Sequence, residues 1–254
     1  MIELKNISAG YGKHLVLKDV SISFEKGKLT SIIGVNGCGK STLLKTILNM
    51  IPLKKGDILL DGNTISNMTR TDIARKAAYL AQGKNTPDMT VEQLVLHGRF
   101  PHLNYPRRYS QKDQKIAFEA MTQMGITTFA HKPLHTLSGG IRQNAYIAMA
   151  LAQDTDYILL DEPTTYLDIT HQLELMKTCK SLVKNGKGII AVMHDLPMAL
   201  TFSDRIVLLN EGTIVSYGKP KQLHAQGDME QIFRLAIEVA EDGEHYYYKY
   251  TLGL

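Results

Sequence analysis

The chain has 254 residues, of which 44% are hydrophobic, and a formal net charge of +4 at pH 7. This length fits one large domain or two compact lobes, and the apolar content is ordinary for a globular core. No apolar run is long enough to cross a membrane, and scattered basic residues argue against nucleic-acid binding. The two cysteines form no metal-ligand pattern and the first residues show no export signal, so we expect a reducing, cytoplasmic setting.

Alternating apolar residues in the first part of the chain predict half-buried strands. Residues 2–7 form one such run and Val16–Phe24 forms the next, with a turn expected at Gly10-Tyr11-Gly12. A further strand pair is expected from Asp57–Asp61 and the turn Asp61-Gly62-Asn63. The N-terminal part therefore predicts an antiparallel β lobe.

Short apolar runs without alternation predict strands that are buried on both faces, as in a parallel sheet. These runs are Thr30–Ile33, Ala77–Ala81, Tyr157–Leu160, Ile189–Met193 and Ile206–Leu209.

The character of the chain changes to helices between about Pro87 and Ala152. The tail predicts one short helix near Met229–Ile237, before a tyrosine-rich end at Tyr246–Tyr248. We therefore predict an α/β fold, in which a core of buried parallel strands and an antiparallel β lobe are formed by 1–86 and 153–254. A helical lobe is expected at about 87–152, and its predicted helices are Val91–His97, Gln111–Met124 and Gly139–Gln153.

The most specific motif is Gly34–Thr42, which matches G-x-x-x-x-G-K-[ST]. It follows the apolar run Leu29–Ile33 and opens a helical stretch, Lys40–Asn49, which is the context that a phosphate-binding loop needs. Backbone N–H groups of such a loop surround phosphate oxygens at the positive end of the helix. Lys40 can reach the β- and γ-phosphates and Ser41 can ligate Mg²⁺, so the motif predicts nucleoside triphosphate binding. The α/β core is therefore predicted to be that of a P-loop NTPase.

Two carboxylates, Asp161 and Glu162, follow the buried run Tyr157–Leu160. The carboxyl end of such a strand is where ligands bind in α/β sheets. We expect Asp161 to hold Mg²⁺ through water and Glu162 to deprotonate the water that attacks the γ-phosphate. Solvated acids at a strand end are the alternative, which the phosphate loop disfavours.

His194 and Gln82 each follow another of these strands. His194 is expected to contact the γ-phosphate, with a structural histidine as the alternative. The Gln82 carboxamide can ligate Mg²⁺ or hold a water molecule, and a surface glutamine is its alternative.

Ser138, Gly139 and Gly140 form a second helix start that is suited to an anion. One nucleotide does not need two phosphate cradles, which suggests that this one serves the γ-phosphate of another subunit. A plain serine cap with glycines for a tight turn is the alternative.

Taken together, these motifs resemble the ATP-binding cassette family. They are GVNGCGKST at 34–42, Gln82, LSGG at 137–140, YILLDEP at 157–163, YLD at 166–168 and His194. The resemblance covers most of the chain in order, and the combination is highly specific.

The resemblance implies a head-to-tail homodimer with ATP sandwiched between the subunits. It implies that Tyr11 stacks on adenine, that Ser138 and Gly140 contact the partner's ATP, and that Asp168 lies at the subunit junction. His194 is similar to the switch histidine. The phosphates would be wrapped by Asn36, Gly37, Cys38, Gly39, Lys40, Ser41 and Thr42, and Mg²⁺ would be held by Ser41, Gln82 and Asp161.

A finer resemblance concerns the cargo. Gly98-Arg99-Phe100-Pro101-His102 and Asp168-Ile169-Thr170-His171-Gln172 resemble ATPase subunits of iron–siderophore importers, with haem and vitamin B12 importers as close relatives. The resemblance implies that an integral membrane permease docks near Gln82 and Gly98–His102. A periplasmic or lipoprotein substrate-binding protein would act indirectly, and the chain would sit at the cytoplasmic face of the membrane. A loop that only packs against the helical lobe is the alternative for Gly98–His102.

The sequence departs from the family pattern at Ile141, where glutamine is common, at Met149, where arginine is frequent, and at Pro197, where asparagine is common. Other functional classes also remain open. They are an exporter ATPase, an importer ATPase for another small solute, a soluble cassette protein acting on DNA or ribosomes, and a nucleotide sensor without turnover.

Overall fold

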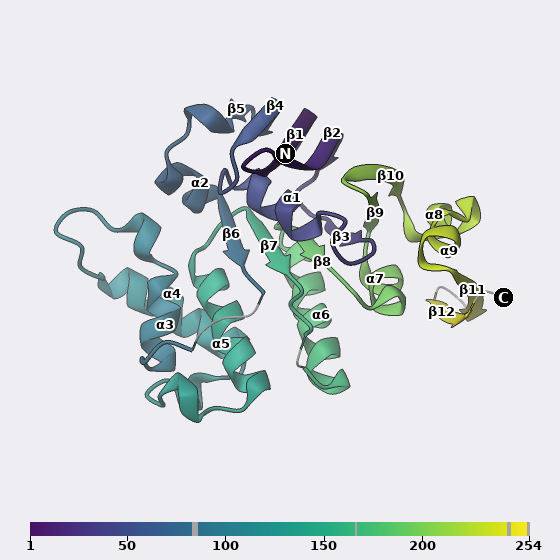
Figure 1. Cartoon of the computed structure of the whole chain (residues 1–254). Coiled ribbons are helices and arrows are strands. Elements are labelled where there is room, and N and C mark those ends of the chain that lie inside the picture. Colours follow the sequence, from purple (N-terminus) through teal and green to yellow (C-terminus); the bar gives the residue numbers. More distant parts are fainter. Residues whose placement is uncertain (83–85, 166, 243–244, 253–254) are drawn as a thin grey trace. The chain divides into compact units, whose positions relative to one another are not determined.

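The computed structural model describes residues 1–82, 86–165, 167–242 and 245–252. Figure 1 shows the helices and strands coloured along the sequence. The internal contacts divide the chain into two compact units. Unit 1 is Met1–Met68 with Thr178–Leu254, and unit 2 is Thr69–Lys177. Tyr166, which belongs to one of the motifs above, lies outside the described residues.

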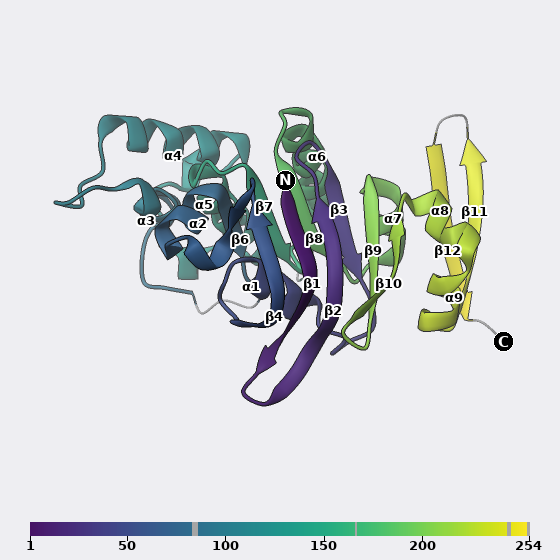
Figure 2. The same cartoon turned by 90° about the horizontal axis from the view of Figure 1, so that it is seen from above.

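An antiparallel sheet in unit 1 confirms the predicted N-terminal β lobe. Its strands run in the order β2-β1-β4-β5, and β1, β2 and β4 lie alongside one another in Figure 2. The turn between these strands lies later than predicted, at Gly12 and Lys13, because Gly10 and Tyr11 still pair with β2. A Cβ atom on Gly10 would lie 2.1 Å from the carbonyl oxygen of His14, so close strand approach explains this glycine. The strands are β1 Ile2–Tyr11, β2 His14–Phe24, β4 Leu53–Leu60 and β5 Asn63–Thr64.

Unit 1 also contains four strands in the order β10-β9-β3-β8. β3 is parallel to both β8 and β9, and every residue of β3 and β8 is buried, as expected from their continuous apolar runs. Helices α1 and α7 contact this unit's strands. The elements are β3 Leu29–Ile33, α1 Lys40–Ile47, β8 Gly188–Val192, α7 Leu196–Phe202, β9 Arg205–Asn210 and β10 Thr213–Gly218, with the short 3₁₀ helix η1 Ile65–Asn67.

The tail differs from its prediction. The predicted helix near Met229–Ile237 ends at Phe233, because Arg234 adopts a left-handed conformation with φ of 55°. The chain then enters an antiparallel hairpin in which Ile237 pairs with Tyr250. The tyrosine-rich end is therefore a strand, which lies beside its partner strand in Figure 2. The elements are α8 Pro220–Gln226, α9 Asp228–Phe233, β11 Leu235–Asp242 and β12 His245–Leu252.

Unit 2 holds the predicted helical segment and two parallel strands. Helices α3, α4 and α5 pack against one another, and α5 also contacts β6. The unit extends beyond 87–152, since Gln153 donates a hydrogen bond to the carbonyl of Ala74. The domain boundaries given above stay a prediction. The elements are α2 Arg70–Lys76, β6 Ala77–Leu80, α3 Val91–His97, η2 Phe100–His102, α4 Gln111–Gln123, η3 Thr127–Phe129, η4 Leu134–Thr136, α5 Gly139–Ala152 and β7 Tyr157–Asp161, with α6 Ile169–Lys184 beginning here.

Burial explains why the helical predictions agree so closely with the structure. α3 has its predicted bounds, and α4 and α5 each end one residue before the predicted end. Ala145, Ala148 and Ala152 of α5 are buried.

No helix within the described part of the chain is both long and apolar enough to cross a membrane.

Candidate nucleotide-binding site

The phosphate loop, residues 34–42, connects β3 to α1 in unit 1. Gly34 has no room for a side chain, since a Cβ atom there would lie 2.1 Å from the carbonyl oxygen of Leu209. Gly37 and Gly39 have φ of 78° and 110°, a region that side chains disfavour. Lys40 is 5% exposed and its Nζ donates hydrogen bonds to the carbonyl oxygens of Gly34 and Val35, at 2.8 and 3.1 Å. The loop therefore curls around the Lys40 ammonium group.

The start of α1 fits a phosphate group. Its N-cap residue Gly39 provides no side-chain cap, and its first turn contains no acidic residue. The first N–H groups of an α-helix have no partner within the helix, and the helix dipole favours an anion at this end. Asn36 and Gly37 at the loop tip are exposed, and a Cβ atom on Gly37 would meet nothing within 4 Å. This combination matches the predicted phosphate cradle.

Three other residues of the predicted loop set are buried or half-buried. Cys38 is 4% exposed, and burial raises the pKa of its thiol although the nearby Lys40 opposes this. Its carbonyl oxygen accepts a hydrogen bond from the Gly212 amide at 3.0 Å. Thr42 is buried and Ser41 half-buried.

His194 and Tyr11 also belong to unit 1, and both are exposed. His194 follows β8, whose Val192 pairs with Ile32 just before the phosphate loop. Because β3 and β8 are parallel, His194 and the loop leave the same edge of the sheet. Tyr11 is the last residue of β1.

The predicted carboxylates meet Gln82 in unit 2. β6 and β7 are parallel with Leu80 opposite Leu160, so Gln82 and Glu162 leave equivalent points of the two strands. The Gln82 amide donates a hydrogen bond to the Glu162 carboxylate. Glu162 has φ of 52°, a strained conformation for glutamate of the kind found at functional sites.

Asp161 has a partner that the sequence reasoning missed. It is 3% exposed, and its Oδ2 accepts a hydrogen bond from the Tyr79 hydroxyl at 2.9 Å. The signal was available, because a tyrosine inside a buried strand usually finds a hydrogen-bond partner. The described residues contain no group of three or more His, Cys, Asp or Glu suited to a metal. A Mg²⁺ ion here would therefore depend on hydroxyl, amide and phosphate oxygens besides Asp161.

The second predicted cradle is the start of α5 in unit 2. Ser138 caps the helix by accepting a hydrogen bond from the Ile141 amide at 3.4 Å, and Ser138 and Gly139 are exposed. Gln143 of the same helix donates to the carbonyl oxygen of Pro163 at 3.0 Å, which ties α5 to the loop that carries Glu162. The departures at Ile141 and Met149 are both half-buried.

Asp168 begins α6. Its Oδ1 accepts hydrogen bonds from both the backbone amide and the ring Nδ1 of His171, at 2.9 and 2.8 Å. These hydrogen bonds, the backbone one first, lower the pKa of Asp168.

Most of the segment Gly98–His102 makes contacts inside unit 2. A Cβ atom on Gly98 would lie 2.2 Å from the carbonyl oxygen of Met149, so α3 and α5 touch there. Arg99 is 5% exposed, and His102 Nε2 hydrogen-bonds to the carbonyl oxygen of Gln153 at 2.8 Å. Only the Phe100 side chain of these is largely exposed, with the Arg107 guanidinium 4.5 Å from its ring centre. The packing alternative therefore explains most of this motif.

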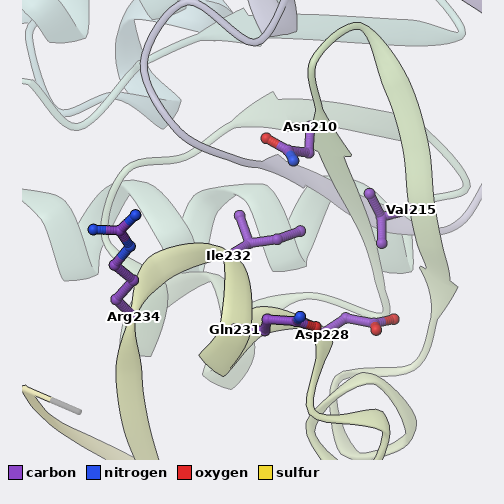
Figure 3. A pocket seen from close by; sticks show the side chains of 6 residues that line it. All are labelled: Asn210, Val215, Asp228, Gln231, Ile232 and Arg234. Atoms are coloured by element: carbon purple, nitrogen blue, oxygen red, sulfur yellow. The ribbon is translucent and has the colours of Figure 1, made fainter. Parts of the chain in front are cut away.

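A separate pocket of about 400 Å³ lies in unit 1 (Figure 3). The Arg234 guanidinium points away from the Asp228 carboxylate there, so the two charges do not converge on one ligand. The pocket shares no residue with the predicted site. Its lining is Asn210, Val215, Asp228, Gln231, Ile232 and Arg234.

Comparison with known proteins identifies the family. The model of the ABC transporter family matches residues 17–165. The chain is 41% identical to the petrobactin import ATP-binding protein FpuD of Bacillus anthracis, over 95% of this chain and 89% of that protein. It is 40% identical to the iron(3+)-hydroxamate import ATP-binding protein FhuC of Bacillus subtilis, over 95% and 90% of the two chains.

The fold is also similar to a solved structure, that of the dimeric bacterial ABC transporter cassette MJ0796. The TM-score is 0.76 at 28% identity, and the similarity covers 87% of this chain and 99% of that one. The predicted fold class is therefore confirmed. The family match extends over more than half of the chain and the relatives cover nearly all of it, so this chain belongs to the ABC transporter family as one of its ATP-binding, ATP-hydrolysing proteins.

Proposed function

We propose that this chain is the ATP-hydrolysing subunit that powers a membrane importer of iron–siderophore complexes, with haem or cobalamin as the next candidate cargo. Two relatives that are at least 40% identical over 95% of the chain are named for petrobactin and iron(3+)-hydroxamate import, which supports this cargo class. The observation that carries the ATPase chemistry is the pairing of Glu162 with Gln82 beside the buried Asp161.

The proposed binding roles follow the residue chemistry. The phosphate loop, from Asn36 to Thr42, binds the triphosphate through backbone N–H groups and the Lys40 ammonium. Tyr11 stacks on the adenine. Ser41, Gln82 and Asp161 hold Mg²⁺, which when bound neutralises phosphate charge and orients the γ-phosphate.

The proposed chemistry is a single displacement. Glu162 accepts a proton from a water molecule as the water oxygen bonds to the γ-phosphorus and the bond to the β-phosphate oxygen breaks. The hydrogen bond that Gln82 donates to Glu162 keeps that carboxylate oriented. His194 contacts the γ-phosphate. The products are ADP and inorganic phosphate.

The proposed assembly is a homodimer in which Ser138, Gly139 and Gly140 of one subunit contact the ATP bound by the other. An integral membrane permease docks near Gln82 and the segment Gly98–His102, in which Phe100 is exposed. This docking keeps the dimer at the cytoplasmic face of the membrane. A substrate-binding protein delivers the cargo to that permease.

We expect Glu162→Gln to retain ATP binding and to lower turnover by roughly 10²–10⁴-fold, the usual contribution of a general base. ATP should then hold the variant as a stable dimer, as measured by phosphate release and by light scattering. Lys40→Ala should instead lose nucleotide binding, which a fluorescent ATP analogue measures. Glu119→Gln, on the exposed face of α4, is the matched control. Near-normal hydrolysis by Glu162→Gln would remove Glu162 from the base role.

The cargo is tested in cells that lack this chain. Uptake of radioactive ferric siderophores should be lost and should return with the wild-type chain, but not with the Glu162→Gln variant. If only haem or cobalamin uptake is lost, the alternative cargo is correct. Unchanged import together with lost efflux of a solute would favour the exporter class instead.

A further inference from the structure

His171 lies between two parts of unit 2. One is Ser138–Gly140, which the proposed function assigns to the partner subunit's ATP, and the other is Asp168, which the family resemblance assigns to the subunit junction. Its ring Nδ1 lies 2.8 Å from Oδ1 of Asp168. The other side of the ring faces α5, since a Cβ atom on Gly140 would lie 3.4 Å from both Cδ2 and Nε2 of His171. One imidazole therefore bridges the start of α6 and the start of α5.

The local contacts hold this ring in one orientation. Asp168 Oδ1 accepts one hydrogen bond from the backbone amide of His171 and one from its ring, so both parts of the residue are held by the same carboxylate oxygen. A Cβ atom on Gly140 would be at van der Waals distance from Cδ2, Nε2 and Cε1 of the ring, so this edge of the imidazole lies beside the first turn of α5. The His171 side chain is 37% exposed, and that of Asp168 is 66% exposed. The bridge thus lies at the surface where Ser138 and Gly139 are also exposed.

Neighbouring contacts tie the same bridge to the loop that carries Glu162. Gln172, the next residue, donates to the carbonyl oxygens of Thr164 and Leu167, at 3.3 and 3.0 Å. Gln143 of α5 holds the carbonyl oxygen of Pro163. The loop after β7 is therefore fixed to α5 at one end and to the first turn of α6 at the other.

We propose that His171 is a positioning residue that sets the spacing between Asp168 and the Ser138–Gly140 cradle, so that both meet the partner subunit together. This inference rests on the proposed function, because it assumes the ATP-bound dimer. His171 does not touch the nucleotide or the reacting water. Its effect is on how readily ATP closes the dimer.

Three substitutions separate the two halves of the bridge. His171→Asn keeps a donor near Asp168 but removes the ring from Gly140. His171→Phe keeps the ring but loses the hydrogen bond. His171→Ala removes both. The matched control is His131→Ala, since His131 in the same unit also lies near a carboxylate, 3.3 Å from Glu92, but its side chain is 89% exposed.

The experiment uses the full chain carrying Glu162→Gln, and light scattering measures the dimer fraction across ATP concentrations. His171→Ala should raise the ATP concentration for half-dimerisation roughly tenfold, and the Asn and Phe variants roughly threefold each, as expected for a lost hydrogen bond or ring contact. His131→Ala should match the parent. Binding of a fluorescent ATP analogue to dilute monomers should be unchanged in every variant, which a merely structural defect would not preserve.

The outcomes distinguish this inference from the function on which it rests. If the Glu162→Gln parent dimerises and His171→Ala dimerises at the same ATP concentration, the positioning role is wrong while the proposed function stands. If the parent stays monomeric at saturating ATP, the proposed dimer is wrong and the positioning role falls with it. Weaker monomer binding by His171→Ala would also overturn the positioning role, because the defect would then precede dimer closure.

Discussion

At the scale of single residues, the Tyr79 hydroxyl donates a hydrogen bond to a carboxylate of the candidate site. Its hydrogen bond to Asp161 at 2.9 Å supports a carboxylate that is 3% exposed and therefore cannot rely on water for stabilisation. A buried carboxylate that loses a donor becomes less stable in its charged form. In the proposed function, Asp161 is one of the residues that hold Mg²⁺.

We therefore expect Tyr79→Phe to weaken the response to Mg²⁺. The concentration of Mg²⁺ that gives half-maximal ATPase activity should rise by roughly threefold to tenfold, the scale of one hydrogen bond. Titration of the metal at saturating ATP measures this. Tyr105→Phe is the matched control, because Tyr105 is 96% exposed. An unchanged metal dependence would mean that the Tyr79 contact is only structural.

The surroundings of Cys38 determine how reactive its thiol is. It is 4% exposed and its pKa is raised by burial, so little of it is the reactive thiolate at neutral pH. In a Cys179→Ser variant, which leaves Cys38 as the sole thiol, a maleimide should label the native chain at least about tenfold more slowly than it labels free cysteine. Mass spectrometry follows the labelling, and urea should restore the fast rate. Complete modification should block ATP binding; normal affinity afterwards would contradict a role of Cys38 in the loop.

At the scale of the elements, α3 and α5 meet where only glycine fits. Gly98 directly follows α3. A Cβ atom added to it would lie only 2.2 Å from the carbonyl oxygen of Met149 in α5, which is too close for any side chain. The glycine in this motif therefore reflects helix packing. Its neighbour Arg99 strengthens the same junction by donating a hydrogen bond to the carbonyl oxygen of Ala152 at 2.9 Å.

Gly98→Ala should separate these two helices. We expect the free energy of unfolding to fall by about 1–3 kcal/mol, as for other overpacked sites. Urea denaturation followed by circular dichroism measures the change. Lys115→Ala, whose side chain on α4 is 77% exposed, should stay within about 0.5 kcal/mol of the wild type. Equal stability of the two variants would show that the helices can shift apart at little cost.

At the scale of the whole molecule, the response to acid depends on a buried ion pair. Asp113 lies 2.9 Å from the Arg99 guanidinium, with side-chain exposures of 11% and 7%. Burial alone would raise the pKa of Asp113, but hydrogen bonds from Ser110 and the Arg99 guanidinium outweigh it and lower the pKa to about 2. The charged carboxylate is therefore favoured in the folded chain.

Because this pKa is lower in the folded chain than in the unfolded chain, its stabilisation is complete above about pH 4 and is lost as the pH falls toward 2. The stabilisation is about 2 kcal/mol. Urea unfolding of wild type and Asp113→Asn should differ most at pH 5–7, and the difference should shrink below pH 4. Other acidic groups titrate in both proteins and cancel in the comparison. A difference that stays constant with pH would show that the ion pair contributes no linkage.

Several features of this protein could be predicted from its sequence alone, because they depend on local chemistry. The phosphate loop, the buried strands and the helices of the middle segment were predictable, because glycine spacing, continuous apolar runs and helical periodicity act within a few residues. The C-terminal hairpin was not, because Arg234 ends the helix in a left-handed conformation and β11 gains its partner only by pairing with β12.

Tertiary structure decided which side chains work together. The sequence placed Asp161, Gln82 and Glu162 at strand ends, but only the parallel register of β6 and β7 brings Gln82 to Glu162 and Tyr79 to Asp161. It did not reveal that most of Gly98–His102 packs against the helices of unit 2, and permease docking at this segment stays a prediction. The physical reason is that a hydrogen bond or a close contact depends on distance in space, and residues far apart in the chain carry no local signal of it.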